Sequence, residues 1–208
     1  MTDSTTLSRR APRRFWGWGQ ADASLDSREQ ATVKTMVEQL EVPYAERAVP
    51  QVHEFTLPSP RVAAPKALVS VFSATPLDRL NHCVGKSYAD LARMWLRAPP
   101  TPPDWVAFPD DEQAVVDILD WAQAHNVAVI PYGGGSSVCG GVEAAVGDSY
   151  AGVVSLDLER LNRVLEVDPV SRAARIQAGA RWGHSCKPSS NRTGSRCATF
   201  RRALSSPR

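Results

Sequence analysis

The chain has 208 residues, of which 43% are hydrophobic and 22% charged, values that are ordinary for a globular protein. No apolar run reaches the roughly 18 residues of a membrane span, which argues against a transmembrane segment. The arginines near the N-terminus lead into Phe15-Trp16-Gly17-Trp18, not into an aliphatic signal core. The four cysteines show neither C-x-x-C pairing nor histidines at metal spacing. We therefore expect a cytoplasmic protein with free thiols and no metal site.

The positive charge lies at the two ends of the chain. Residues 1–14 hold four arginines against one acid, and residues 182–208 hold five arginines and one lysine without an acid. The formal net charge of +2 therefore hides an acidic middle. Because no basic stripe alternates with aromatic residues there, we expect no nucleic-acid partner.

The first predicted helix covers residues 27–40. Ser27 and Gln30 have the spacing of a capping box at its start. Apolar residues then recur at helical spacing, namely Val33, Met36, Val37 and Leu40. After this helix, prolines break the chain into extended pieces up to residue 76.

A second helix is expected over residues 87–97, with Ser87 and Asp90 as its cap. Its predicted apolar face consists of Tyr88, Leu91, Ala92, Trp95 and Leu96. Four prolines between positions 99 and 103 then suggest a stiff linker. We accordingly place an N-terminal helical and extended segment at 15–100 and the start of a second domain at residue 101.

Residues 101–181 show the clearest pattern. A short strand at 105–108 precedes a helix that begins near Pro109 and Asp110 and closes at His125-Asn126. A β-branched run at 127–130 follows, and 152–156 reads as another strand. A hairpin is expected from 164–167 and 173–178, turning at Asp168-Pro169. Mixed helix and strand signals predict an α+β fold.

A glycine-rich loop follows the strand at 127–130. Residues 133–138 read Gly-Gly-Gly-Ser-Ser-Val. Glycines let successive backbone N–H groups point at one anion, and two serines add short hydroxyl donors. A plain turn or flexible linker is the alternative, but linkers are rarely placed between β-branched residues. A P-loop would need lysine where Gly141 stands, and a dinucleotide motif starting at Gly133 would need glycine where Val138 stands.

The last segment, residues 182–208, has a different character. It is rich in serine and arginine, and Leu204 is its only aliphatic residue larger than alanine. Such a segment buries too little apolar surface to offset its ordering entropy, so we expect disorder. The abrupt change near Arg181-Trp182 favours a product of a shifted reading frame over a basic nucleic-acid tail.

Residues 103–112 together with the loop at 129–137 resemble FAD-linked oxidases of the vanillyl-alcohol oxidase (PCMH-type) superfamily. Within it, the loop and the following Gly140-Gly141-Val142-Glu143 are most similar to the alkyldihydroxyacetonephosphate synthases and their bacterial relatives. Trp16-Gly17-Trp18-Gly19 and residues 85–91 resemble that family's N-terminal helical segment. The resemblance covers about residues 15–181 and is most specific in the loop.

This resemblance implies a flavin cofactor. In the family, backbone amides of the loop bind the FAD pyrophosphate, which points to Pro131, Tyr132, Gly133, Gly134, Gly135, Ser136 and Ser137 as cofactor-binding residues. Some relatives tether FAD through a histidine near this loop. Residues 133–141 contain no histidine, so we expect non-covalent FAD. Cys139 is expected to pack behind the loop as an inert thiol and not to act as a tether.

The resemblance also implies a longer FAD domain followed by a substrate domain that carries the catalytic residues. These parts are not found in residues 1–208, so we expect a C-terminally truncated protein with an incomplete FAD-binding domain that retains little flavin. We assign no catalytic residue, and none of the histidines (His53, His82, His125 and His184) receives a role.

Three functions remain open at this point. The first is FAD binding, as the N-terminal part of a flavin-dependent oxidoreductase or an alkyldihydroxyacetonephosphate synthase-like enzyme. The second is a non-catalytic module for a phosphate-bearing ligand, and the third is an inactive truncation product. The residues indicate neither the substrate nor the oligomeric state.

Overall fold

The computed structural model describes residues 13–40, 47–168, 170–171 and 173–180, and it has the predicted α+β architecture. The element order is α1 (Ser27–Gln39), η1 (Val52–Glu54), η2 (Lys66–Val71), β1 (Phe72–Ser73), α2 (Pro76–Asn81), α3 (Tyr88–Trp95), β2 (Trp105–Ala107), α4 (Glu112–Ala124), β3 (Val127–Tyr132), β4 (Gly152–Asp157), β5 (Val164–Asp168) and β6 (Ala173–Ile176).

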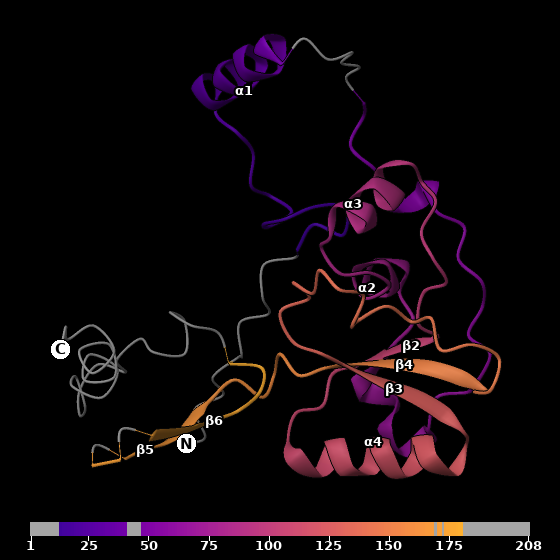
Figure 1. The fold of residues 1–208 in the computed structure, drawn as a ribbon. Coiled ribbons are helices and arrows are strands. Elements are labelled where there is room, and N and C mark those ends of the chain that lie inside the picture. The colour runs from indigo at the N-terminus through magenta and orange to yellow at the C-terminus, as the bar shows by residue number, and fades with distance from the viewer. Residues whose placement is uncertain (1–12, 41–46, 169, 172, 181–208) are drawn as a thin grey trace, which may run out of the picture.

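A four-stranded sheet with the order β1-β2-β4-β3 lies at the centre of the fold (Figure 1). Strands β2, β4 and β3 run parallel, while β1 runs antiparallel to β2. The carboxyl ends of the three parallel strands therefore meet at one edge of the sheet. In open sheets of this kind, that edge is where ligands bind.

One face of the sheet is covered by α4 (Figure 1). Ile118 and Ala122, one helical turn apart, are buried against it. The helix begins two residues later than predicted, because the side chain of Asp111 accepts a hydrogen bond from the Ala114 N–H and caps it. The sheet side of this core consists of Val71, Phe72, Ala107, Val127, Val154 and Leu156.

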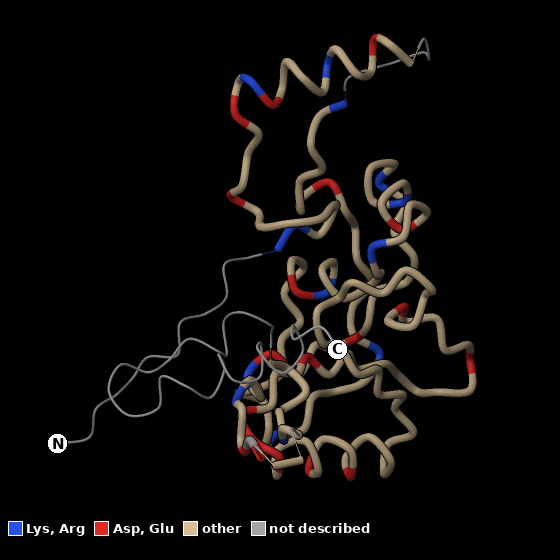
Figure 2. The backbone as a smooth tube through the Cα atoms, turned by 60° about the vertical axis from the view of Figure 1, so that its left-hand side comes forward, with Lys and Arg blue, Asp and Glu red and all other residues tan. Residues whose placement is uncertain are grey.

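Three acidic residues of α4 are exposed, namely Glu112, Asp117 and Asp120, and the Asp and Glu positions of the described residues are red in Figure 2. The helix contains no lysine or arginine. These acidic residues repel a polyanion, which agrees with the expectation of no nucleic-acid partner, although that expectation itself stays a prediction.

A second core lies on the other side of the sheet, around α2 and α3 (Figure 1). Its buried members come from three parts of the chain: Phe15, Phe55, Leu80, Cys83, Val84 and Met94. The rings of Phe15 and Phe55 meet edge to face with 5.5 Å between centroids. This core ties residues near the start of the chain to the helices above the sheet.

The two N-terminal helices exist as predicted, but details differ. Helix α1 is capped by Asp26 and Glu29, one residue before the predicted Ser27 and Gln30, because the carboxylate of Asp26 accepts from the Glu29 N–H. None of its residues is buried, and Met36 is 59% exposed. Helical periodicity thus predicted the helix but not a packed face.

Ser87 and Asp90 form the predicted capping box of α3. The predicted apolar face of this helix was partly wrong. Tyr88 is 89% exposed and Leu96 is 60% exposed, whereas Met94 is fully buried. The helix is rotated toward Met94 because it packs against the second core, which the spacing of apolar residues alone does not reveal.

Strands β5 and β6 form the predicted antiparallel hairpin as a separate two-stranded sheet. Part of its turn and the whole of the tail at 182–208 lie outside the described residues, so the expectation for the tail stays a prediction. The boundary at residue 101 also stays a prediction. Within the described ranges, no helix has the length and apolar character needed to cross a bilayer.

Helix α4 offers a matched pair of substitutions. Ile118 is 0% exposed and Leu119, the next residue, is 46% exposed. We expect Ile118→Ala to lower the free energy of unfolding by about 2–5 kcal/mol, since it removes buried methyl groups and leaves a cavity. Leu119→Ala should change it by less than about 1 kcal/mol. Urea denaturation followed by tryptophan fluorescence measures both, and equal losses would contradict this placement of the core.

Candidate functional site

The glycine loop follows β3 at the carboxyl edge of the sheet. In the parallel pairing of β3 with β4, Tyr132 lies opposite Asp157, the last residue of β4. The loop therefore begins beside a carboxylate that sequence reasoning did not single out. An acidic residue at the end of a buried strand next to the loop was the available signal.

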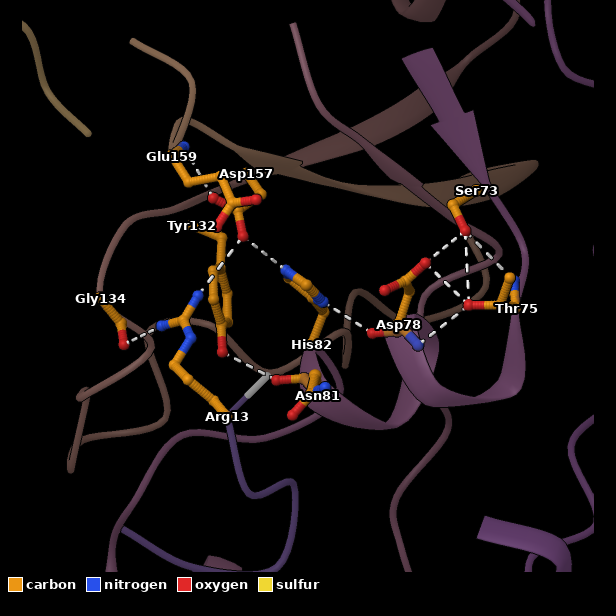
Figure 3. Close-up of polar contacts among 10 residues, drawn as sticks. All are labelled: Arg13, Ser73, Thr75, Asp78, Asn81, His82, Tyr132, Gly134, Asp157 and Glu159. Atoms are coloured by element: carbon orange, nitrogen blue, oxygen red, sulfur yellow. Dashed lines mark hydrogen bonds and ion pairs between the residues drawn. The ribbon is translucent and has the colours of Figure 1, made fainter. Parts of the chain in front are cut away.

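Two carbonyl groups of the loop are held by other parts of the chain. The Ser137 carbonyl oxygen accepts a hydrogen bond of 2.7 Å from the backbone N–H of Lys86. The Gly134 carbonyl oxygen accepts one from the guanidinium of Arg13 (Figure 3). These bonds fix the direction in which the peptide groups of the loop point.

The backbone N–H groups of residues 133–138 donate none of the hydrogen bonds found among the described residues. A row of unpaired N–H groups is the donor arrangement that binds phosphate oxygens. A Cβ added at Gly133 would also meet no atom within 4 Å, so space is open there. The loop therefore suits the diphosphate group of FAD in both its donors and its room.

Tyr132 packs with its side chain against the loop at Gly135. Its side chain is buried, and its hydroxyl donates a hydrogen bond of 2.7 Å to the Asn81 carbonyl oxygen of α2. Gly135 has a φ of +67° and lies directly over the phenol, so that a Cβ there would overlap the hydroxyl. Glycine is thus required at position 135 for two reasons, the left-handed backbone and the close approach.

The segment Gly85-Lys86 supports the loop from the side. A Cβ added at Gly85 would lie 2.1 Å from the Ser137 carbonyl oxygen, so only glycine allows this approach. The ammonium group of Lys86 is buried and donates to the carbonyl oxygens of Arg14 at 3.0 Å and Phe15 at 3.4 Å. Lys86 therefore links the loop to the N-terminal segment.

Asp157 forms the centre of a buried polar cluster (Figure 3). One of its carboxylate oxygens lies 2.9 Å from His82 Nε2 and 3.5 Å from Arg13 Nη2, and the other accepts from the Glu159 N–H at 2.8 Å. His82 Nδ1 lies 2.6 Å from the Asp78 carbonyl oxygen. Both ring nitrogens of His82 thus lie within hydrogen-bond distance of an oxygen atom.

His82 has no role predicted from its sequence context, and it lies 75 residues from Asp157 along the chain. No local signal in the sequence connects the two, because only the packing of α2 on the sheet brings them together. Arg13, 121 residues before Gly134, was missed for the same reason.

The seven residues expected to bind the cofactor fall into three groups. Pro131 is the exposed residue before the end of β3 and has no N–H to donate. Tyr132 directs its side chain into the protein. The remaining five, Gly133, Gly134, Gly135, Ser136 and Ser137, form the loop itself.

The expected packing of Cys139 behind the loop was wrong, while its expected lack of a role as a flavin tether stays a prediction. Its thiol is exposed and not packed behind the loop, and it lies 3.6 Å from the Ser137 hydroxyl. That hydroxyl and the Gly141 N–H lower the pKa of the thiol. The chain turns outward after Ser137, and this turn carries Cys139 to the surface.

The lowered pKa of the buried Lys86 leads us to expect that the free energy of unfolding depends on pH. Burial, together with the nearby Arg13, lowers the pKa of Lys86 to about 8 from 10.5. Between these values the unfolded chain keeps a proton that the folded chain has released, so the free energy of unfolding rises with pH.

The test compares the parent chain with Lys86→Met. We expect the difference in unfolding free energy between the two to grow by up to about 3 kcal/mol, in favour of the parent, from pH 8 to 10.5. The pKa of the buried Cys83 thiol, raised to about 12, acts in the opposite direction, but it is present in both proteins. A difference independent of pH would contradict the burial of a lysine with a lowered pKa.

Comparison with known proteins shows what this chain is similar to. A family model described as an FAD binding domain matches residues 103–187. Alkyldihydroxyacetonephosphate synthase of Trypanosoma brucei brucei is 41% identical over 101 residues, which are 49% of this chain and 16% of that protein. D-2-hydroxyglutarate dehydrogenase of Xanthomonas citri pv. viticola is 36% identical over 115 residues, which are 54% of this chain and 22% of that protein.

A solved structure of an alkyldihydroxyacetonephosphate synthase has the same fold, with a TM-score of 0.66 and 24% identity over 81% of this chain and 36% of the other. The chain spans about a sixth to a fifth of the length of the curated relatives that it matches. The flavin prediction is confirmed at the level of a domain. Residues 103–187 therefore match an FAD binding domain, and about half of the chain is similar to alkyldihydroxyacetonephosphate synthases.

Proposed function

We propose that residues 133–137 bind the diphosphate group of a non-covalently held FAD. The observation that carries this proposal is the polarity of the loop. Its Gly134 and Ser137 carbonyl groups are bonded to Arg13 and Lys86, while the N–H groups of residues 133–138 have no partner among the described residues. A diphosphate supplies acceptors only, so it matches what the loop leaves open.

The chain would then act as the flavin-binding part of an oxidoreductase or an alkyldihydroxyacetonephosphate synthase-like enzyme, as the names of its relatives suggest. FAD supplies the redox or carbanion-stabilising chemistry in such enzymes, and the protein positions it. Among the described residues, the site contributes amide donors, two serine hydroxyls and the buried polar cluster around Asp157. No catalytic residue is assigned.

A titration with FAD tests this proposal. Purified protein is titrated with FAD, FMN, riboflavin and ADP, and binding is followed by flavin or tryptophan fluorescence. We expect FAD to bind most tightly, FMN less tightly, and riboflavin least tightly, because among these three flavins FAD carries a diphosphate, FMN a single phosphate and riboflavin none. ADP binding as tightly as FAD would favour the alternative of a phosphate-ligand module, and no saturable FAD binding would overturn the proposal.

Gly133 is the sharpest position for a substitution. A methyl group there meets no protein atom within 4 Å, so Gly133→Ala should leave the fold intact while it occupies the open side of the loop. We expect the dissociation constant for FAD to rise at least about 10-fold, or about 1.4 kcal/mol. Leu119→Ala is the control, because this exposed position of α4 is not part of the loop or of its contacts. Equal effects of the two substitutions on FAD binding would contradict the site.

The non-covalent attachment has its own test. The nearest described imidazole, His82, has both ring nitrogens engaged, by Asp78 and Asp157, and Cys139 is the exposed thiol next to the loop. After reconstitution with FAD, the protein is precipitated with acid and the supernatant is assayed for flavin. We expect all of the flavin in the supernatant. Flavin that stays in the pellet, and that Cys139→Ser releases, would show a thioether tether instead.

A further inference from the structure

Arg13 is the one basic side chain of the described residues that bonds directly to the glycine loop. One nitrogen of its guanidinium donates to the Gly134 carbonyl oxygen, and another lies 3.5 Å from the Asp157 carboxylate. The guanidinium also lies 5.4 Å from the centroid of the Tyr132 ring (Figure 3). Arg13 thus contacts Gly134 in the loop, the Tyr132 ring and the Asp157 carboxylate at the end of β4.

The position of Arg13 is fixed by its own neighbours. The backbone pairs Arg13 with Gln20, and the Arg14 N–H donates to the Gly19 carbonyl oxygen at 3.2 Å. The next residue, Phe15, is buried in the second core at 5% exposure. Lys86 bonds to the carbonyl oxygens of Arg14 and Phe15. Arg13 therefore extends from an anchored turn and not from a free end.

The contacts of Arg13 give it two effects on an anion site. It engages the Gly134 carbonyl oxygen in a hydrogen bond, which keeps that carbonyl from turning toward a phosphate that it would repel. It also adds a positive charge beside the buried Asp157, whose carboxylate is 1% exposed and adjoins the loop. Without the positive charge of Arg13, the negative charge of the Asp157 carboxylate would repel a diphosphate more strongly.

We propose that Arg13 is a positioning residue of the flavin site, which fixes the glycine loop in its anion-binding conformation and offsets the charge of Asp157. The proposal rests on the assignment of the loop to the FAD diphosphate. Arg13 acts through Gly134 and Asp157, because both terminal nitrogens of its guanidinium are directed at these groups and not at the open side of the loop.

The test uses Arg13→Ala and Arg13→Lys, with Arg97→Ala as the control. Arg97 is a similarly half-buried arginine that joins two segments through the Ala48 carbonyl oxygen and the Glu54 carboxylate, far from the loop in sequence and in contacts. We expect Arg13→Ala to raise the dissociation constant for FAD at least 10-fold. Arg13→Lys should fall between it and the parent, because lysine keeps the charge but loses the forked geometry. Arg97→Ala should stay within twofold of the parent.

A second readout reports on the loop without flavin. Cys139 follows the loop, and its thiol owes its lowered pKa to the Ser137 hydroxyl and the Gly141 N–H. In a Cys186→Ser, Cys197→Ser background, the rate of alkylation of Cys139 by iodoacetamide is measured against pH. If Arg13 holds the loop, Arg13→Ala should shift the pKa of this thiol upward, toward the ordinary value, and Arg97→Ala should not.

The two readouts separate the possible failures. An Arg13→Ala protein that binds FAD within twofold of a binding parent overturns the proposal. If the parent itself binds no FAD, the proposed function fails, and the alkylation profile alone decides whether Arg13 holds the loop. An unchanged profile in Arg13→Ala then overturns the positioning role.

Discussion

The structure around the site depends on the burial of one carboxylate, that of Asp157. A buried anion costs several kcal/mol unless it is paired and hydrogen-bonded, and this one has three kinds of partner. The His82 ring comes from the end of α2, the guanidinium of Arg13 from the turn before α1, and the N–H of Glu159 from the chain after β4. Satisfying Asp157 therefore requires two distant segments, those of Arg13 and His82, to meet the end of β4 at the carboxyl edge of the sheet.

Contacts from outside the glycine loop also determine its conformation. Glycine removes the steric barriers to an anion-binding conformation but does not select it, because glycine also permits many other conformations. Selection comes from outside the loop, through the Lys86 N–H on the Ser137 carbonyl, Arg13 on the Gly134 carbonyl, and the Tyr132 phenol below Gly135. The entropy lost by ordering a glycine-rich segment is thus offset by contacts formed with the protein and not with the ligand.

Local patterns in the sequence predicted most elements of the fold. The strand, helix, strand and loop order of residues 105–137 and the later hairpin follow from periodicity and turn residues, and all of them are found. The cap of α1 was predicted one residue too late, because Asp26 with Glu29 and Ser27 with Gln30 both have the spacing of a capping box. The buried face of α3 was misjudged because Met94 faces a core assembled from residues 15, 55 and 80, which no local window contains. The loop could be read from its glycines, whereas Arg13, His82 and Asp157 form a site only after folding.

The family match begins at residue 103, yet much of what shapes the loop comes from before it. Strand β1 adds an edge to the sheet, Tyr132 bonds to Asn81, and Gly85 allows the backbone to approach Ser137. Residues 103–187, which match the FAD binding domain, therefore do not contain all the contacts that determine the conformation of the loop. A transplant of residues 103–187 into another protein would move the glycines and leave behind the side chains that give them their direction. A fragment of this chain that is to keep the conformation of its glycine loop must therefore include the N-terminal segment as well.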